Sequence, residues 1–226
     1  MSILILVSAT ADSFSLHLSG TAISDLRAAL SPLGTVIVTE QTPPTPLLGS
    51  DQPPLLALGG TLLSWGLPAT NSPIMGYPSV WLAVSVSPNL IVGGNLAGFN
   101  WLDDNIQSVG PFISTSWGNN QKFINASFNI QHLKGPDDFH VRDIAFSLSQ
   151  TIKYPKWLFA AGYTAHFMQF KVRVKEPQNY QTIKNIDQGL FRFSAYRQLG
   201  KSFQIGDELY LSTESIMTNL VLLFYF

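Results

Sequence analysis

Six side chains in the second half of the chain have the types and spacing to form one polar cluster. They are Asp143, His166, Arg192, Glu208, Tyr196 and Tyr210. If the segments carrying them pair as hairpins, counting about Tyr154-Pro155 places Asp143 opposite His166. Counting outward from the middle of the longer connection near residue 178 places His166 opposite Arg192. Counting outward from the turn at Gly200-Lys201 places Arg192 one diagonal step from Glu208. We therefore expect an ionic belt across four adjacent strands, with the two tyrosines beside it.

This ionic belt would permit three kinds of chemistry. Charges in a narrow, poorly hydrated interior must pair, because an unpaired buried charge costs several kcal/mol. The interpretation we favour is therefore a salt-bridge lock that fills a closed lumen. The alternatives are a selectivity ring or small polar-ligand site, and a catalytic pair in which Asp143 orients His166 as a base.

The segments that must position these residues alternate in hydropathy. Most carry large apolar side chains on one face and Ser, Asn, Gly, Thr or Ala on the other, which is typical of barrel strands. A soluble sheet would instead carry many Lys and Glu on its polar face. The segments are Leu55–Trp65, Ser79–Val86, Leu90–Trp101, Val109–Trp117, Lys122–His132, Val141–Ile152, Trp157–Val172, Gly189–Leu199, Phe203–Leu211 and Ile216–Phe226.

The segment Ile216–Phe226 is the most specific of these. Leu220, Leu222, Phe224 and Phe226 share one face, which needs an apolar medium. This stripe resembles the terminal strand of bacterial outer-membrane β-barrels, where a final Phe is part of the signal read by the barrel-assembly machinery. The resemblance implies an all-β, antiparallel, up-and-down transmembrane barrel of about ten strands, with eight to twelve as the range. It also implies location in the bacterial outer membrane, with lipid and the assembly machinery as partners.

Composition excludes several other classes of protein. Charged residues are only 12% and the net charge is −1, which argues against a nucleic-acid partner. The absence of Cys excludes disulfides, thiolate metal sites and a cysteine nucleophile. No run of about 20 apolar residues exists, so a spanning helix is not expected. We find no phosphate loop and no paired metal ligands, and we expect neither cofactor nor metal.

Connection lengths alternate along the barrel segments. Connections near residues 88, 119, 155 and 200 are short, whereas those near 103, 136, 178 and 214 are longer. Outer-membrane barrels have short periplasmic turns and longer external loops, so the short turns are expected in the periplasm. The segment Arg173–Ile186 is expected as the longest loop. Basic residues flank it and could contact lipopolysaccharide phosphates or simply keep a loop solvated; they are Lys171, Arg173, Lys175 and Lys184.

A second Asp and His set lies in the external stretch His132–His140. Asp137 could polarise a histidine that activates water. This arrangement resembles the omptin proteases, which are also ten-stranded, but these need a second acidic pair, for which Asp103-Asp104 is the candidate. Gly-Pro-Asp-Asp is also an ordinary turn sequence, so a solvated loop is the expected state. A weak contact to a divalent cation and proteolysis are the alternatives.

Three regions follow from these patterns. Residues 1–11 read as the remnant of a signal peptide cleaved before Asp12, because a short apolar core precedes the small residues Ala9 and Ala11; a buried strand is the alternative. Residues 12–54 read as an irregular, proline-rich periplasmic or lumen-plugging segment, and residues 55–226 as the barrel. Two features depart from the pattern: Asp207 falls on the lipid face, which a bulge at Gly206 would relieve, and Gly94 and Gly98 leave few apolar side chains on the lipid face of their strand. Paired glycines such as Gly93-Gly94 indicate close packing or bulges.

The function predicted from sequence is an outer-membrane barrel with a structural or narrow-pore role and a lumen largely filled by a polar, ionic network. No catalytic site stands out, and enzymatic activity is left open. One alternative is a secreted soluble β-sandwich that binds sugar or protein. Another is an outer-membrane enzyme acting on lipid or peptide at the rim.

Overall fold

The structure is a computed structural model that describes residues 30, 56–68, 74–75, 79–101, 104–119, 121–134, 139–174, 180–213 and 215–226. The predicted signal peptide and nearly all of the predicted segment 12–54 lie outside this range. Leu30 is the described residue of that segment, and it is helical and fully buried. In the described residues, no helix is long and apolar enough to cross a membrane.

The described residues form ten long strands and one strand of two residues. The long strands are β1 (Leu56–Pro68), β3 (Ser79–Ser87), β4 (Leu90–Trp101), β5 (Asp104–Gly118), β6 (Lys122–Lys134), β7 (Phe139–Lys153), β8 (Trp157–Val174), β9 (Tyr180–Gln198), β10 (Phe203–Leu211) and β11 (Ser215–Tyr225). The short strand β2 (Ile74–Met75) pairs with β1 alone. The predicted ten-stranded antiparallel barrel is therefore confirmed.

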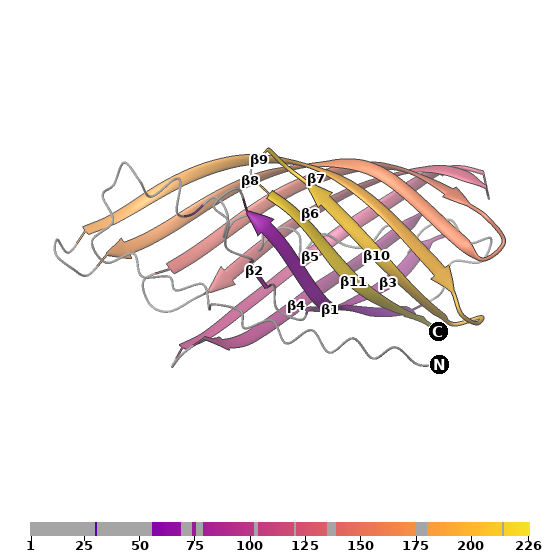
Figure 1. Ribbon diagram of the computed structural model, residues 1–226, viewed down its shortest axis with the longest axis horizontal. Coiled ribbons are helices and arrows are strands. Elements are labelled where there is room, and N and C mark those ends of the chain that lie inside the picture. Colours follow the sequence, from indigo (N-terminus) through magenta and orange to yellow (C-terminus); the bar gives the residue numbers. More distant parts are fainter. Residues whose placement is uncertain are drawn as a thin grey trace.

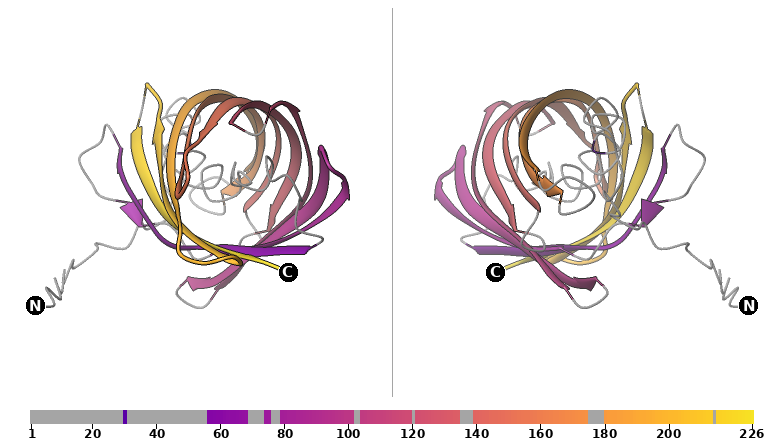
Figure 2. Two further views of the ribbon diagram at one scale, coloured as in Figure 1. Left: turned by 90° about the vertical axis from the view of Figure 1, so that its right-hand side faces the viewer. Right: turned by 90° about the vertical axis from the view of Figure 1, so that its left-hand side faces the viewer.

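The sheet closes on itself. Each long strand pairs antiparallel with its neighbours in sequence, and β1 pairs with β11 from Ala57–Tyr225 to Pro68–Ser215. Figure 1 shows the strands running obliquely along the barrel, and the end-on views of Figure 2 show a ring in which β1 lies beside β11. A closed ring leaves no free edge and no second sheet, so the β-sandwich alternative is wrong.

Alternation determines which face of each strand points outward. In β9, Phe191 and Phe193 are 57% and 45% exposed on the exterior, whereas Leu190, Arg192 and Ser194, which alternate with them, are buried. All the long strands whose side chains are described follow this pattern. Outward residues are mainly Val, Leu, Ile, Phe, Tyr and Trp, so the exterior is an apolar band suited to lipid.

One end of the barrel holds the tight connections 88–89, 119–121, 154–156 and 199–202, and we call it the turn end; the opposite end is the loop end. The turn after β5 is an example of a tight connection that Gly and Asn make possible. Gly118 has a φ of 142°, and a Cβ there would lie 2.4 Å from the Lys122 carbonyl oxygen. Asn119 Oδ1 accepts hydrogen bonds from the amides of Gln121 and Lys122 at 3.0 and 2.8 Å.

The predicted loop Arg173–Ile186 is wrong. Strand β8 continues to Val174 and β9 begins at Tyr180, with an unbroken register between them. In Figure 1 this hairpin reaches beyond its neighbours at the loop end. The alternation signal fails there because the outward residues become polar once the strands leave the apolar band, as at Asn185 and Asp187, which are exposed.

The predicted bulge at Gly206 is also wrong. Pairing of β10 with β9 and β11 is continuous through Gly206, and Asp207 points outward, where Thr218 Oγ1 donates to its Oδ1 at 2.8 Å. Gly206 serves packing instead, because a Cβ there would lie 2.1 Å from the ring of its direct partner Tyr196.

Two other inward aromatic rings also lie over a directly paired glycine. A Cβ on Gly59 would lie 2.1 Å from Trp81, and one on Gly93 would lie 2.4 Å from Phe112. These glycines therefore make room for large rings inside the barrel, and the register is continuous through Gly93 and Gly94.

Candidate functional site in the barrel interior

A buried carboxylate holds together the residues of strands β9 and β10 that face the lumen. Arg192 Nη2 donates to Glu208 Oε1 at 2.7 Å, and the hydroxyls of Tyr196 and Tyr210 donate to Glu208 Oε1 and Oε2. The guanidinium carbon of Arg192 also lies 5.8 Å from the Tyr210 ring centroid. We call these four residues the glutamate cluster. Its one negative and one positive charge neutralise each other, and three donors satisfy the carboxylate, as a buried ion pair requires.

The second polar contact links β7 and β8. His166 Nδ1 and Asp143 Oδ2 are 2.8 Å apart, and both residues are only 1% exposed. The register differs by two residues from the expected one, since Asp143 pairs directly with Met168 and His166 with Ala145. The two side chains therefore meet diagonally across the strands. We call them the histidine pair.

The pairing of β8 with β9 does not place His166 opposite Arg192, as the sequence analysis expects. His166 lies opposite Gln188, and Arg192 lies opposite Gly162, a shift of four residues from the expected register. In the described part of the chain, the predicted belt is therefore two separate groups, the histidine pair nearer the loop end and the glutamate cluster nearer the turn end.

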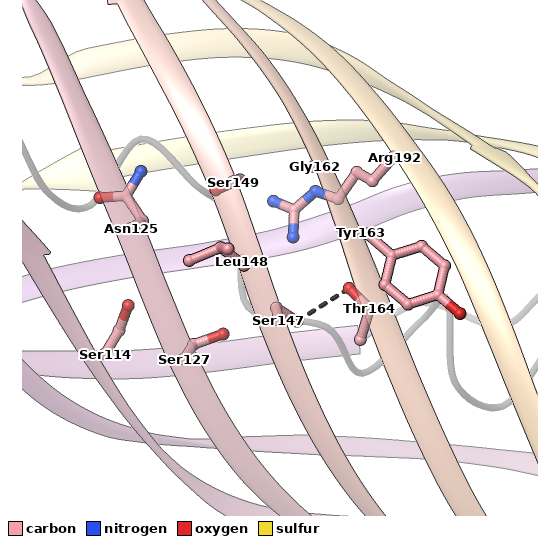
Figure 3. Close-up of a pocket in the computed structure, with 10 residues that line it drawn as sticks. All are labelled: Ser114, Asn125, Ser127, Ser147, Leu148, Ser149, Gly162, Tyr163, Thr164 and Arg192. Carbon is pink, nitrogen blue, oxygen red and sulfur yellow. Dashed lines mark hydrogen bonds between the residues drawn. The ribbon is translucent and has the colours of Figure 1, made fainter.

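A small polar cavity lies beside Arg192. Its volume is about 20 Å³, and Figure 3 shows hydroxyl and amide side chains from β5 to β8 around it. Ser147 Oγ and Thr164 Oγ1 are 2.8 Å apart, and Asn125 Nδ2 donates to Thr151 Oγ1 at 2.9 Å. A volume of this size holds about one water molecule, not a solute.

Apolar side chains form a cluster inside the turn end of the barrel, where the sequence predicts polar ones. Ten buried residues form this cluster, which we call the turn-end core. They are Ala57, Trp81, Ala83, Ile91, Phe112, Phe123, Leu158, Tyr196, Val221 and Leu223. Tyr196 belongs to both this core and the glutamate cluster. The inward face therefore combines an apolar cluster at the turn end with buried polar residues such as Asn129, Gln131 and Asp143 nearer the loop end. A lumen largely filled by polar groups stays a prediction.

A signal for the turn-end core was present in the alternation. Trp81 shares the face of Ser79 and Ala83, and Phe112 that of Gly110 and Ser114. Small neighbours on the same face make room for one large ring. The outward apolar stripe distinguishes the lipid face of a strand from its lumen face. It does not indicate that a single large residue on the lumen face belongs to a core.

The structure describes only some of the residues predicted to contact lipopolysaccharide, so this contact stays a prediction. Lys171 is exposed on the outer face, whereas Lys184 shares the inner face with buried Ile186. Lys175 lies outside the described residues, and nothing is described of the Arg173 side chain.

The rim histidines also lie away from the lumen. His132 and His140 are on the outer face, paired with Arg142 and Lys134. Asp137 and Asp103 lie outside the described residues, and so does the side chain of Asp104. Among the described residues, no group of three or more His, Cys, Asp or Glu could hold a metal ion.

Comparison with known proteins finds similar architecture and no family. No protein-family model matches the sequence, and a search of curated proteins finds no relative. Among solved structures, the chain is similar to a loop-deletion mutant of OmpT, an outer membrane protein of Vibrio cholerae, at 9% identity over 85% of this chain and 72% of that one, with a TM-score of 0.40.

Two further solved structures are similar. They are Ail, the attachment invasion locus protein of Yersinia pestis (8% identity, 75% of this chain and 95% of that one, TM-score 0.37), and the translocator domain of autotransporter NalP from Neisseria meningitidis (10%, 90% and 96%, TM-score 0.42). At this identity the likeness concerns the fold alone. The closed ring with an apolar exterior is the architecture of an outer-membrane β-barrel.

Proposed function

We propose that this protein is a sealed structural barrel of the bacterial outer membrane, with its turn end in the periplasm and its loop end outside. The observation that carries the proposal is the turn-end core. Trp81, Phe112 and Leu223 of this core are all at most 4% exposed, which supports a lumen closed to solutes at the turn end. Opening a path there would expose closely packed apolar surface to water, at about 25 cal/mol for each Å².

The glutamate cluster supports the same function. A selectivity ring needs charges that face a water-filled path, whereas Arg192 and Glu208 are bound to each other and to two phenols. Such a network cross-links β9 and β10 and borders the turn-end core, since Tyr196 belongs to both. We therefore favour the lock over the narrow pore.

The histidine pair does not favour catalysis. An Asp–His pair acts on a substrate only where the histidine can reach one, and His166 is 1% exposed. The alternative of an enzyme acting at the rim has no support either, because among the described residues no acidic side chain contacts a histidine there. A structural role accounts for both groups without a substrate.

Planar-bilayer recording tests the proposal. The wild-type protein is expected to give no single-channel steps, because the lumen is packed. The variant Phe112→Ala/Leu223→Ala removes two side chains from the turn-end core and is expected to give measurable leak. The matched control Phe191→Ala/Leu209→Ala removes the same side-chain types from the outer face and is expected to stay silent. Regular steps from the wild-type protein would overturn the sealed barrel.

A further inference from the structure

The outer face of β6, β7 and β8 becomes strongly basic at the loop end. Five residues make up this surface, which we call the basic patch. They are His132, Lys134, His140, Arg142 and Lys171. Four are exposed and His140 is half-buried, whereas the alternate residues Leu133, Val141 and Phe170 are buried inside the barrel. The patch therefore points sideways from the barrel wall, not into the lumen.

Strand pairing places these side chains in two adjacent rows. In one row Lys134 pairs with His140, and His140 pairs with Lys171. In the other row His132 pairs with Arg142. Directly paired residues have Cβ atoms about 5 Å apart, so three permanent cations lie within about 10 Å of one another.

No described acidic residue neutralises the basic patch. The patch residues have no ion pair with any carboxylate in the part of the chain that the structure describes. Asp187 is the described acidic residue on the outer face nearest to the patch. It pairs with Phe167, which lies two residues closer to the turn end than Gln169, the partner of Arg142. Like charges held this close repel, so the surface favours an anionic partner.

The patch begins where the apolar band stops. The outward residues one step closer to the turn end are Ile130, Ile144 and Phe167, which pair with one another. Along β8, Phe167 lies ten residues after Trp157 at the turn end. At a rise of about 3.3 Å and a tilt of about 40°, this distance is about 25 Å along the barrel axis, the height of an outer-membrane apolar band. Arg142 therefore lies at the level of the lipid headgroups.

We propose that the basic patch binds the phosphate groups of a phosphorylated glycolipid in the external leaflet of the outer membrane. Lys134, Arg142 and Lys171 supply the charge, and Arg142 can hold a phosphate with two parallel hydrogen bonds. His132 and His140 add donors between them. The acyl chains of the same lipid would lie on Ile144 and Phe167 below. The proposal rests on the membrane placement given above, but not on whether the lumen is sealed.

A binding assay with defined lipids tests the proposal. The full chain is folded into neutral detergent micelles, and its affinity for lipid A, for lipid A without its phosphates and for phosphatidylglycerol is measured. Wild-type protein is expected to bind phosphorylated lipid A at least tenfold more tightly than the dephosphorylated form, and more weakly as salt increases. Tight binding of phosphatidylglycerol at the same level would contradict a glycolipid partner.

Matched charge variants locate the site. The variant Lys134→Gln/Arg142→Gln/Lys171→Gln is expected to lose tenfold or more in affinity. The control Lys122→Gln/Lys156→Gln/Lys201→Gln removes three exposed charges at the turn end and is expected to bind as wild type does. Equal losses in both variants, or none in the first, would refute the patch. Should the first variant not fold, Arg142→Gln alone gives the same comparison, with Arg197→Gln as its control.

Failure of this inference can be distinguished from failure of the proposed function. Protein that inserts into neutral lipid vesicles and shows heat-modifiable gel mobility, yet does not distinguish the two forms of lipid A, would sink this inference and leave the sealed barrel standing. Failure to insert would sink the membrane placement itself.

Discussion

Removing the positive charge from the glutamate cluster should strongly destabilise the barrel. In Arg192→Met, the Glu208 carboxylate stays buried at 1% exposure but loses the 2.7 Å bond to its counter-charge. Breaking one side of a buried ion pair costs about 3–5 kcal/mol. The hydroxyls of Tyr196 and Tyr210 still donate to the carboxylate, so we expect a value near the lower limit, about 3 kcal/mol.

The assay for Arg192→Met is reversible urea unfolding in lipid vesicles, followed by tryptophan fluorescence. A loss of about 3 kcal/mol corresponds to a change of roughly 100-fold in the unfolding equilibrium. The control Arg197→Met makes the same substitution on the same strand at an exposed position whose guanidinium lies 5.7 Å from the Trp157 ring, and should cost less than about 1 kcal/mol. Adding Glu208→Gln to Arg192→Met should recover part of the loss, because no charge then remains in the glutamate cluster. A loss below about 1 kcal/mol in Arg192→Met, or no recovery in the double variant, would refute the salt-bridge lock.

Three further predictions use the same unfolding assay. Gly206→Ala places a Cβ 2.1 Å from the Tyr196 ring and should cost about 1–3 kcal/mol, whereas Gly200→Ala, with no atom within 4 Å of the new Cβ, should change stability by less than about 0.5 kcal/mol; equal effects would contradict the packing role of Gly206. Asp207→Leu removes a carboxylate from the lipid face and should stabilise by about 1 kcal/mol despite losing the bond from Thr218, and a clear loss of stability would mean that Asp207 has a partner in the membrane. Trp81→Ala should cost about 3–5 kcal/mol because Trp81 is buried in the turn-end core, whereas Trp117→Ala, on the exposed outer face, should cost much less; similar losses would argue against a packed lumen.

The fold could be predicted from the sequence because lipid imposes a strict rule on one face of each strand. Every second residue of the spanning strands must be apolar, and residues such as Phe146, Leu148 and Phe191 follow this rule. Short turns marked by Gly, Asn and Pro then determine where the strands reverse. Strand ends at the loop end could not be predicted, because β8 and β9 leave the apolar band there and their alternation ceases to differ from that of a polar loop.

The interior was harder to predict for two physical reasons. The diagonal step between Arg192 and Glu208 followed from a tight turn of known length, whereas the pairing of His166 depended on a connection whose length the sequence does not show. Alternation also says which face a residue occupies, not how the lumen is filled. The pairing of Gly59 with Trp81 and of Gly93 with Phe112 became meaningful only once the register was known.

The most direct test of the sealed lumen is thiol labelling, which is simple here because the chain has no cysteine. Ser147→Cys introduces one thiol at the small lumenal cavity, and Lys156→Cys introduces one at an exposed turn. With the folded protein in micelles, a small water-soluble maleimide is expected to label the turn within minutes and to leave the lumenal thiol unmodified until urea unfolds the barrel. Labelling of Ser147→Cys in the folded state at the rate of the turn variant would show an open, water-filled passage and would contradict the sealed barrel.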